Sequence, residues 1–222
     1  MEHFKMFIAG KFCEAKSGKT MQALDPGTGQ PVATVPCGGP ADADKAVRAV
    51  RKAFDSGTWS GLSPEDRSAI IMDWADRIEM QVPRLAMYES MNSGALISSV
   101  GGSIWTAVRS MRNLAWYAAT QFPWREEVPM SGGIVGFGRN VTIREPIGVC
   151  VGIVPWNMPI MMALWKISHA IAMGNTIVIK PASDTPLSAL ILGETIAESK
   201  IPKGVINIVT GPGGELGEAL AS

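Results

Sequence analysis

The sequence predicts an α/β fold built on a parallel sheet. Strand-like apolar runs begin at Ile147, Thr176 and Val205, and each begins 29 residues after the one before it. Helical patterns over 160–173 and 185–199 separate these runs, and an apolar content of 46% can fill a sizeable core. Strands that alternate with helices at this spacing form a right-handed βαβαβ unit.

The first 35 residues predict a small antiparallel edge. Short strand-like pieces (FKMFIAGKF, KTMQALD, PVATV) are separated there by Gly and Pro turns. A surface helix over 42–54 follows, because Ala46, Val50 and Phe54 share one helical face.

Three helical segments are expected next. Ser63 followed by Pro64 is a typical N-cap and first position, so a helix is predicted over about 64–80. Pro83 should break the pattern, and a second segment follows it. A third helix is predicted over 102–120.

Residues 125–146 predict a β-hairpin. The segment is glycine-rich and alternates in polarity, and it stands between the helices of 1–124 and the α/β section of 147–222. An exposed pair of strands is marginal alone, so we interpret it as an oligomerisation arm through which copies of the chain associate. The alternative is a surface hairpin that folds back on its own domain.

Composition limits the partners and the compartment. Twenty basic residues balance twenty acidic ones without long runs, so neither nucleic acid nor an anionic membrane is an expected partner. The cysteines Cys13, Cys37 and Cys150 match neither a disulfide framework nor a zinc site, which favours the cytoplasm. We find no export signal, and Lys166 interrupts the most apolar run, so no membrane span is expected.

The three parallel strands should deliver polar groups to one edge. Their carboxyl ends lead into residues 155–157, 180–181 and 210–213, and open α/β sheets bind ligands at such an edge. The last segment opens the sequence GPGGELG, whose N–H groups suit a phosphate. Leu216 stands where a dinucleotide fingerprint needs its third glycine, so that signal is weak.

Lys180 and Asn157 are the main candidate site residues. Lys180 could donate to ribose hydroxyls or phosphate, or could reach solvent past the sheet. Asn157 lies between Pro155 and Pro159, and such a rigid amide can stabilise an oxyanion, an effect worth on the order of 10²–10³ in rate. The alternative for Asn157 is an amide that satisfies the backbone of its own loop.

Lys166 and His169 lie one turn apart on the helix after Asn157. Lys166 could act in proton transfer or extend to water, and we expect His169 to pack within the helix layer. The only other histidine is His3, so no Ser/His/Asp or Cys/His constellation can be assembled.

Several motifs resemble the aldehyde dehydrogenase superfamily in order and spacing. They are FIAGKF, DPGTGQPVATVP, WSGLSPEDR, REPIGV, PWNMP, ALWK, KPASDTPLSAL and IPKGVINIVTGPG. The resemblance extends over nearly the whole chain. It implies the N-terminal, cofactor-binding portion of that fold: a Rossmann-like parallel βαβαβ sheet with helices, and a protruding hairpin at 125–146 that serves oligomerisation.

The resemblance also implies roles for individual residues. Asn157 is similar to the side-chain half of the family's oxyanion hole, and Lys166 is similar to a lysine that supports proton relay. Lys180 matches the lysine that binds the adenosine ribose of NAD or NADP. The implied cofactor-binding residues are Val154, Pro155, Trp156, Lys180, Pro181, Ala182, Ser183 and Gly213.

The sequence departs from the family pattern in two ways that limit what the resemblance implies. Many members that prefer NAD have Glu where this chain has Ser183, with Asp184 next, so dual or NADP use is compatible with the sequence. The family's nucleophilic Cys and general-base Glu belong to a later part of the chain than Ser222. Cys150, inside the first parallel strand, is expected to pack rather than to react.

We therefore expect the complete enzyme to oxidise a small-molecule aldehyde to a carboxylic acid with NAD or NADP. This chain would supply the cofactor site and Asn157, and would associate with a second copy or with the missing C-terminal portion. Alternatives are a non-catalytic nucleotide-binding or assembly module, and an unrelated α/β nucleotide binder in which the motif matches are coincidental.

Overall fold

The main sheet has five strands in the order β3-β2-β10-β9-β8 in a computed structural model that describes residues 1–128 and 140–222. Strands β8 (Val149–Ile153), β9 (Thr176–Lys180) and β10 (Ile206–Ile208) are mutually parallel. This confirms the predicted βαβαβ unit. Strands β8 and β10 begin slightly later than the sequence pattern indicated.

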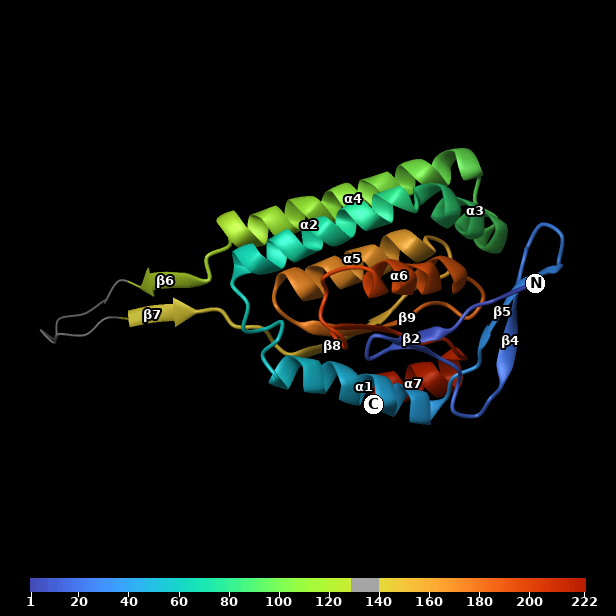
Figure 1. Ribbon diagram of the computed structural model, residues 1–222, viewed down its shortest axis with the longest axis horizontal. Helices are drawn as coiled ribbons and strands as arrows, with labels where there is room; N and C mark the ends of the chain where they lie inside the picture. Colours follow the sequence, from blue (N-terminus) through green and yellow to red (C-terminus); the bar gives the residue numbers. More distant parts are fainter. Residues whose placement is uncertain (129–139) are drawn as a thin grey trace, which may run out of the picture.

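Helices cover both faces of this sheet. The crossover helices α5 (Pro159–Ala172) and α6 (Leu187–Ala197) lie on one face, and α1 (Pro40–Asp55) and α7 (Glu218–Ala221) lie on the other (Figure 1). All five residues of β9 are buried, as a central parallel strand requires.

A further helical layer packs on α5 and α6. It consists of α2 (Pro64–Met80), α3 (Val82–Ser93) and α4 (Ile97–Thr120) (Figure 1). Ser63 Oγ accepts a hydrogen bond of 3.0 Å from the Asp66 N–H, which confirms the predicted cap of α2.

Helix α4 begins before the predicted residue 102. A glycine pair at 101–102 lies inside the helix, although glycine disfavours this position. The buried side chains of Val100 and Ile104, which pack in the core on either side of the pair, outweigh that local preference.

The N-terminal segment corrects one expectation, because its strands join two different sheets. Strands β2 (Met6–Ile8) and β3 (Lys11–Cys13) extend the main sheet, with β2 antiparallel to β10. A second sheet has the order β1-β5-β4, from β1 (Glu2–His3), β5 (Pro31–Pro36) and β4 (Thr20–Leu24), and β1 is parallel to β5. Periodicity identified these strands but could not assign them to a sheet, because pairing partners are distant in sequence.

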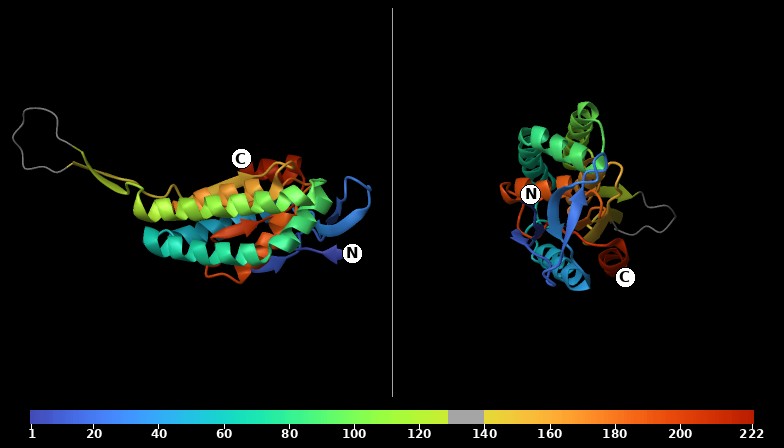
Figure 2. Two further views of the ribbon diagram at one scale, coloured as in Figure 1. Left: turned by 90° about the horizontal axis from the view of Figure 1, so that it is seen from above. Right: turned by 90° about the vertical axis from the view of Figure 1, so that its right-hand side faces the viewer.

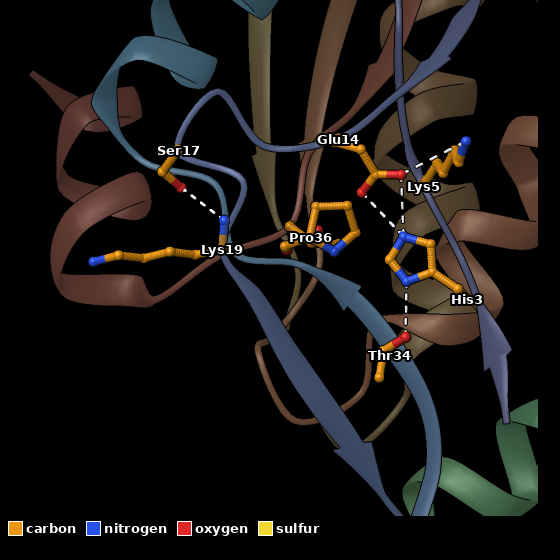
Figure 3. Close-up of polar contacts among 8 residues, drawn as sticks. His3, Lys5, Glu14, Ser17, Lys19, Thr34 and Pro36 are labelled. Carbon is orange, nitrogen blue, oxygen red and sulfur yellow. Dashed lines mark hydrogen bonds and ion pairs between the residues drawn. The ribbon is translucent and has the colours of Figure 1, made fainter.

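Polar contacts hold β1 against both parts of this segment (Figure 3). His3 Nδ1 lies 2.7 Å from Thr34 Oγ1 on β5, and His3 Nε2 lies 3.0 Å from the Glu14 carboxylate after β3. Lys5 adds an ion pair of 3.6 Å to Glu14. These groups are partly exposed, so the contacts orient the strands more than they stabilise them.

The base of the predicted hairpin is present as β6 (Arg125–Val128) paired antiparallel with β7 (Asn140–Ile143). Both strands project from the body of the protein (Figures 1 and 2). Residues 129–139 of the predicted hairpin lie outside the described residues. In the described part of the chain, the helices are too short or too polar to cross a bilayer.

The loop before α1 forms two hydrogen bonds with Thr210, just after the end of β10. The Thr210 hydroxyl donates to the Pro36 carbonyl at 2.7 Å, and the Gly38 N–H donates to the Thr210 carbonyl at 2.8 Å. A Cβ at Gly211 would lie 2.2 Å from the Gly38 carbonyl oxygen, so only glycine fits there.

Gly211→Ala should therefore lower the free energy of unfolding by about 2 kcal/mol, because the clash is with backbone that cannot rotate away. Urea denaturation measures this difference. Gly213→Ala is the matched control, since open space surrounds that position, and it should change stability by less than about 0.5 kcal/mol. Equal stability of the two variants would contradict the close approach.

Candidate functional site at the carboxyl edge of the sheet

The ends of the three parallel strands meet, as the sequence predicted. The Val154 N–H after β8 donates to the Lys180 carbonyl at 2.9 Å. Beyond β9, the Ser183 hydroxyl donates to the Gly211 carbonyl at 3.0 Å. The three candidate segments therefore form one continuous edge.

Lys180 is buried, with 2% of its surface exposed, so it does not extend past the sheet into solvent. Its ammonium donates one hydrogen bond of 3.2 Å to the Pro181 carbonyl. Its side chain passes close to Gly217, where a Cβ would lie 3.6 Å from Lys180 Cε. Burial lowers the pKa of Lys180. The described residues offer no acceptor for its remaining N–H groups, which are available to a ligand.

Asn157 lies in the exposed loop between β8 and α5. Val154 at the start of this loop is buried, whereas Pro155, Trp156 and Asn157 are exposed. The Asn157 side chain forms no hydrogen bond within the described part of the chain, so it does not satisfy the backbone of its own loop. Its amide is therefore free to donate to a bound group.

The glycine-rich turn after β10 differs from its predicted form. It opens a π-helical turn, η1 (Gly213–Gly217), in which the Leu216 and Gly217 N–H groups both point to the Pro212 carbonyl. Gly213 is exposed and has open space where a side chain would be. On the neighbouring strand end Pro181 is buried, and Ala182 and Ser183 are half-buried.

Lys166 lies apart from the strand-end loops. It is half-buried on α5 beside Gly152, and it lines a hollow of about 450 Å³ at the base of the hairpin. Cys150 lines the same hollow, and burial raises the pKa of its thiol, which suits a packing role. The prediction for His169 was wrong: it is exposed, with Nδ1 2.7 Å from the Trp165 carbonyl.

Two buried polar residues on α3 escaped the sequence analysis. Glu89 accepts a hydrogen bond of 3.1 Å from the Ile160 N–H at the start of α5. Asn92 donates to the Asp184 carbonyl at 2.8 Å, in the loop before α6. The sequence did contain a signal for them. Glu89 and Asn92 follow Leu85 by four and seven residues, so they lie on the apolar face of the helix, where polar side chains are unusual.

Burial raises the pKa of the Glu89 carboxyl, and the hydrogen bond from the Ile160 N–H opposes that rise. Over residues 1–128 and 140–222, His, Cys, Asp and Glu side chains form no group of three or more that could hold a metal ion.

Three parallel strands of an open mixed sheet end beside a buried lysine and a free amide, and this arrangement defines an α/β protein with a candidate ligand site at the strand ends. Residues 12–222 match the family model described as the aldehyde dehydrogenase family. The chain therefore belongs to this family.

Relatives and solved structures agree with this assignment. The chain is 39% identical to aldehyde dehydrogenase 1A1 of Rattus norvegicus, with all of this chain and 44% of that protein aligned. An NAD⁺ complex of an aldehyde dehydrogenase from Bacillus cereus superposes with a TM-score of 0.92 at 37% identity, over 99% of this chain and 44% of that one.

Betaine aldehyde dehydrogenase from Staphylococcus aureus, in complex with NAD⁺, gives a TM-score of 0.92 at 29% identity, over 98% of this chain and 42% of that one. The chain thus spans less than half the length of each of these three relatives.

The burial of Lys180 leads to a test of pH dependence. Between the lowered pKa of Lys180 in the folded chain and its ordinary value of 10.5, the unfolded chain binds more protons at this group than the folded chain. Stability therefore rises with pH through this window. Lys180→Met should be more stable than the wild type at pH 7, and its advantage should shrink by pH 10.

Urea denaturation at both pH values measures this difference. Lys200→Met, at a lysine whose side chain is 71% exposed, controls for loss of one positive charge. An advantage of Lys180→Met that stays constant with pH would contradict the lowered pKa.

Proposed function

We propose that this chain supplies the NAD(P) site and one half of the oxyanion hole of an enzyme that oxidises an aldehyde to a carboxylic acid. The observation that carries the proposal is the buried ammonium of Lys180, which has N–H donors to spare beside the loop that bears the free amide of Asn157. Family membership supports the oxidation of an aldehyde.

The residues present fit a dinucleotide. The Lys180 ammonium would donate to ribose hydroxyls, and the open surface at Gly213 would admit an adenine ring without a side-chain clash. Val154, Pro155 and Trp156 would border the nicotinamide. When bound, the nicotinamide would accept the hydride that leaves the substrate. Two similar solved structures are complexes with NAD⁺, which supports this choice of cofactor.

Asn157 would stabilise negative charge on the substrate oxygen. Its loop is fixed by Pro155 at one end and by Pro159, the first residue of α5, at the other, so little reorganisation opposes the hydrogen bond. Lys166, which lines the hollow at the base of the hairpin and not the strand-end loops, would support proton relay from the helix that follows the Asn157 loop.

The choice between NAD and NADP would depend on Ser183. Its hydroxyl donates to the Gly211 carbonyl, and it carries no charge that would repel a 2′-phosphate. We infer that the site accepts both cofactors.

We also propose that β6 and β7, the described strands of the segment 125–146, belong to an oligomerisation arm separate from the cofactor-binding domain. Every residue of β6 is exposed, and a two-stranded ribbon of this kind is marginal without further packing. Pairing with a second copy would supply that packing.

Lys180→Ala should weaken NAD⁺ and NADP⁺ binding alike by about tenfold or more, because it removes a charged donor. Ser183→Glu should weaken NADP⁺ binding by about tenfold and leave NAD⁺ binding nearly unchanged, because the new carboxylate repels the 2′-phosphate. Titration calorimetry on the wild type and both variants measures the six affinities, with Lys200→Ala as the control. Equal NADP⁺ affinity in the wild type and both variants would refute this assignment of the strand end.

Residues 1–222 alone should bind nucleotide without oxidising aldehydes. Cys150 lines the hollow at the base of the hairpin, apart from the strand-end loops. Burial raises the thiol pKa of Cys150 and of Cys13, and a raised pKa disfavours the nucleophilic thiolate. The purified chain, mixed with either cofactor and several aldehydes, should show no steady rise in absorbance of the reduced cofactor. A sustained rise would overturn this expectation.

A further inference from the structure

Both crossover helices begin directly after a loop of the proposed site. Helix α5 follows the loop that carries Asn157, and α6 follows the loop that carries Ser183. The first N–H groups of a helix have no partner within the helix and need a cap. Met158 and Pro186 occupy the N-cap positions, and in this part of the described chain neither helix has a capping side chain of its own or an acid in its first turn.

Glu89 provides the missing acceptor for α5. It is 6% exposed, and its Oε1 accepts from the Ile160 N–H at 3.1 Å, at the second residue of the helix. Its Oε2 is buried and has no hydrogen-bond partner among the described residues. A carboxylate at this end of a helix also complements the positive end of the helix dipole.

Asn92 provides the corresponding contact for α6. It is 4% exposed, and its Oδ1 accepts from the Leu187 N–H at 3.4 Å. Its amide donates to the Asp184 carbonyl at 2.8 Å and to the Leu24 carbonyl at 3.1 Å. One side chain therefore fixes the start of α6, the loop before it and the end of β4.

We propose that Glu89 and Asn92 are positioning residues that cap α5 and α6 from α3 and thereby hold the two loops that carry Asn157 and Ser183. The two residues are three positions apart on one helix, so α3 holds both loops in a fixed relation. The proposal rests on the proposed function for the purpose of the loops, but the caps themselves can be tested without any nucleotide.

The wild-type chain provides the first test, by amide hydrogen exchange followed by nuclear magnetic resonance. The Ile160 and Leu187 N–H groups should exchange slowly although they lie in first helical turns, where such groups usually exchange fast. Fast exchange at both amides would overturn the proposal, even if every variant failed to fold.

Substitution provides the second test. Glu89→Ala should speed exchange across 157–163 by about tenfold, and Asn92→Ala should do so across 184–190. Glu89→Gln keeps an acceptor for the Ile160 N–H and should restore protection at 157–163. Acceleration that spreads evenly over the whole chain would indicate general destabilisation and would refute a positioning role.

Asn175→Ala is the matched control. Asn175 is also a buried amide, 6% exposed, but it accepts from the Gly148 N–H at 2.8 Å at the opposite edge of the sheet. This variant should leave NAD⁺ affinity within about twofold of the wild type, whereas Glu89→Ala and Asn92→Ala should weaken it by about fivefold or more.

The two proposals fail separately. A wild-type chain that binds no NAD⁺ would refute the proposed function, and the exchange pattern would still decide the role of the caps. Unchanged NAD⁺ affinity in Glu89→Ala and Asn92→Ala, beside a wild type that binds, would refute positioning alone.

Discussion

Complete burial of β9 is the constraint on which the rest of the structure depends. A strand buried on both faces needs a neighbour on each side and a helix layer above and below, and β8, β10, α5, α6 and α1 meet those needs. The same constraint places the side chain of Lys180 inside the protein, because the strand has no exposed face to which it could turn.

Polar side chains at the amino ends of the parallel strands differ in their hydrogen bonding from those at the carboxyl ends. At the amino edge, Asn175 bonds with the backbone of Gly148 and Ala170, and the Thr176 hydroxyl donates to the Val50 carbonyl. At the carboxyl edge, Lys180 and Asn157 keep donors that no described residue accepts. Satisfied polar groups stabilise a fold, whereas donors without a protein acceptor suit a ligand. The carboxyl edge has both kinds, because Thr210 and Ser183 there are satisfied while Lys180 and Asn157 keep spare donors.

Local sequence signals predicted much of this arrangement. The 29-residue spacing predicted the parallel unit and the edge at which its strands end, and Ser63 with Pro64 predicted the start of α2. Both signals lie in segments that are close to one another along the chain. The placement of β2 beside β10 and the caps from Glu89 and Asn92 could not be predicted in this way. Each depends on a contact between segments far apart in the chain, and neither periodicity nor propensity encodes such a contact.

The pairing of Phe7 with Ile208, and of the Thr210 hydroxyl with the Pro36 carbonyl 174 residues away, has a consequence for folding kinetics. The parallel unit forms from segments close in sequence, but β2 must wait for β10 before it gains a partner. Contacts of such long range form slowly, and during synthesis the apolar strand Met6–Ile8 is made long before the strand that covers it. We therefore expect the β2–β10 pairing and the Thr210 contact with Pro36 to form after the parallel unit.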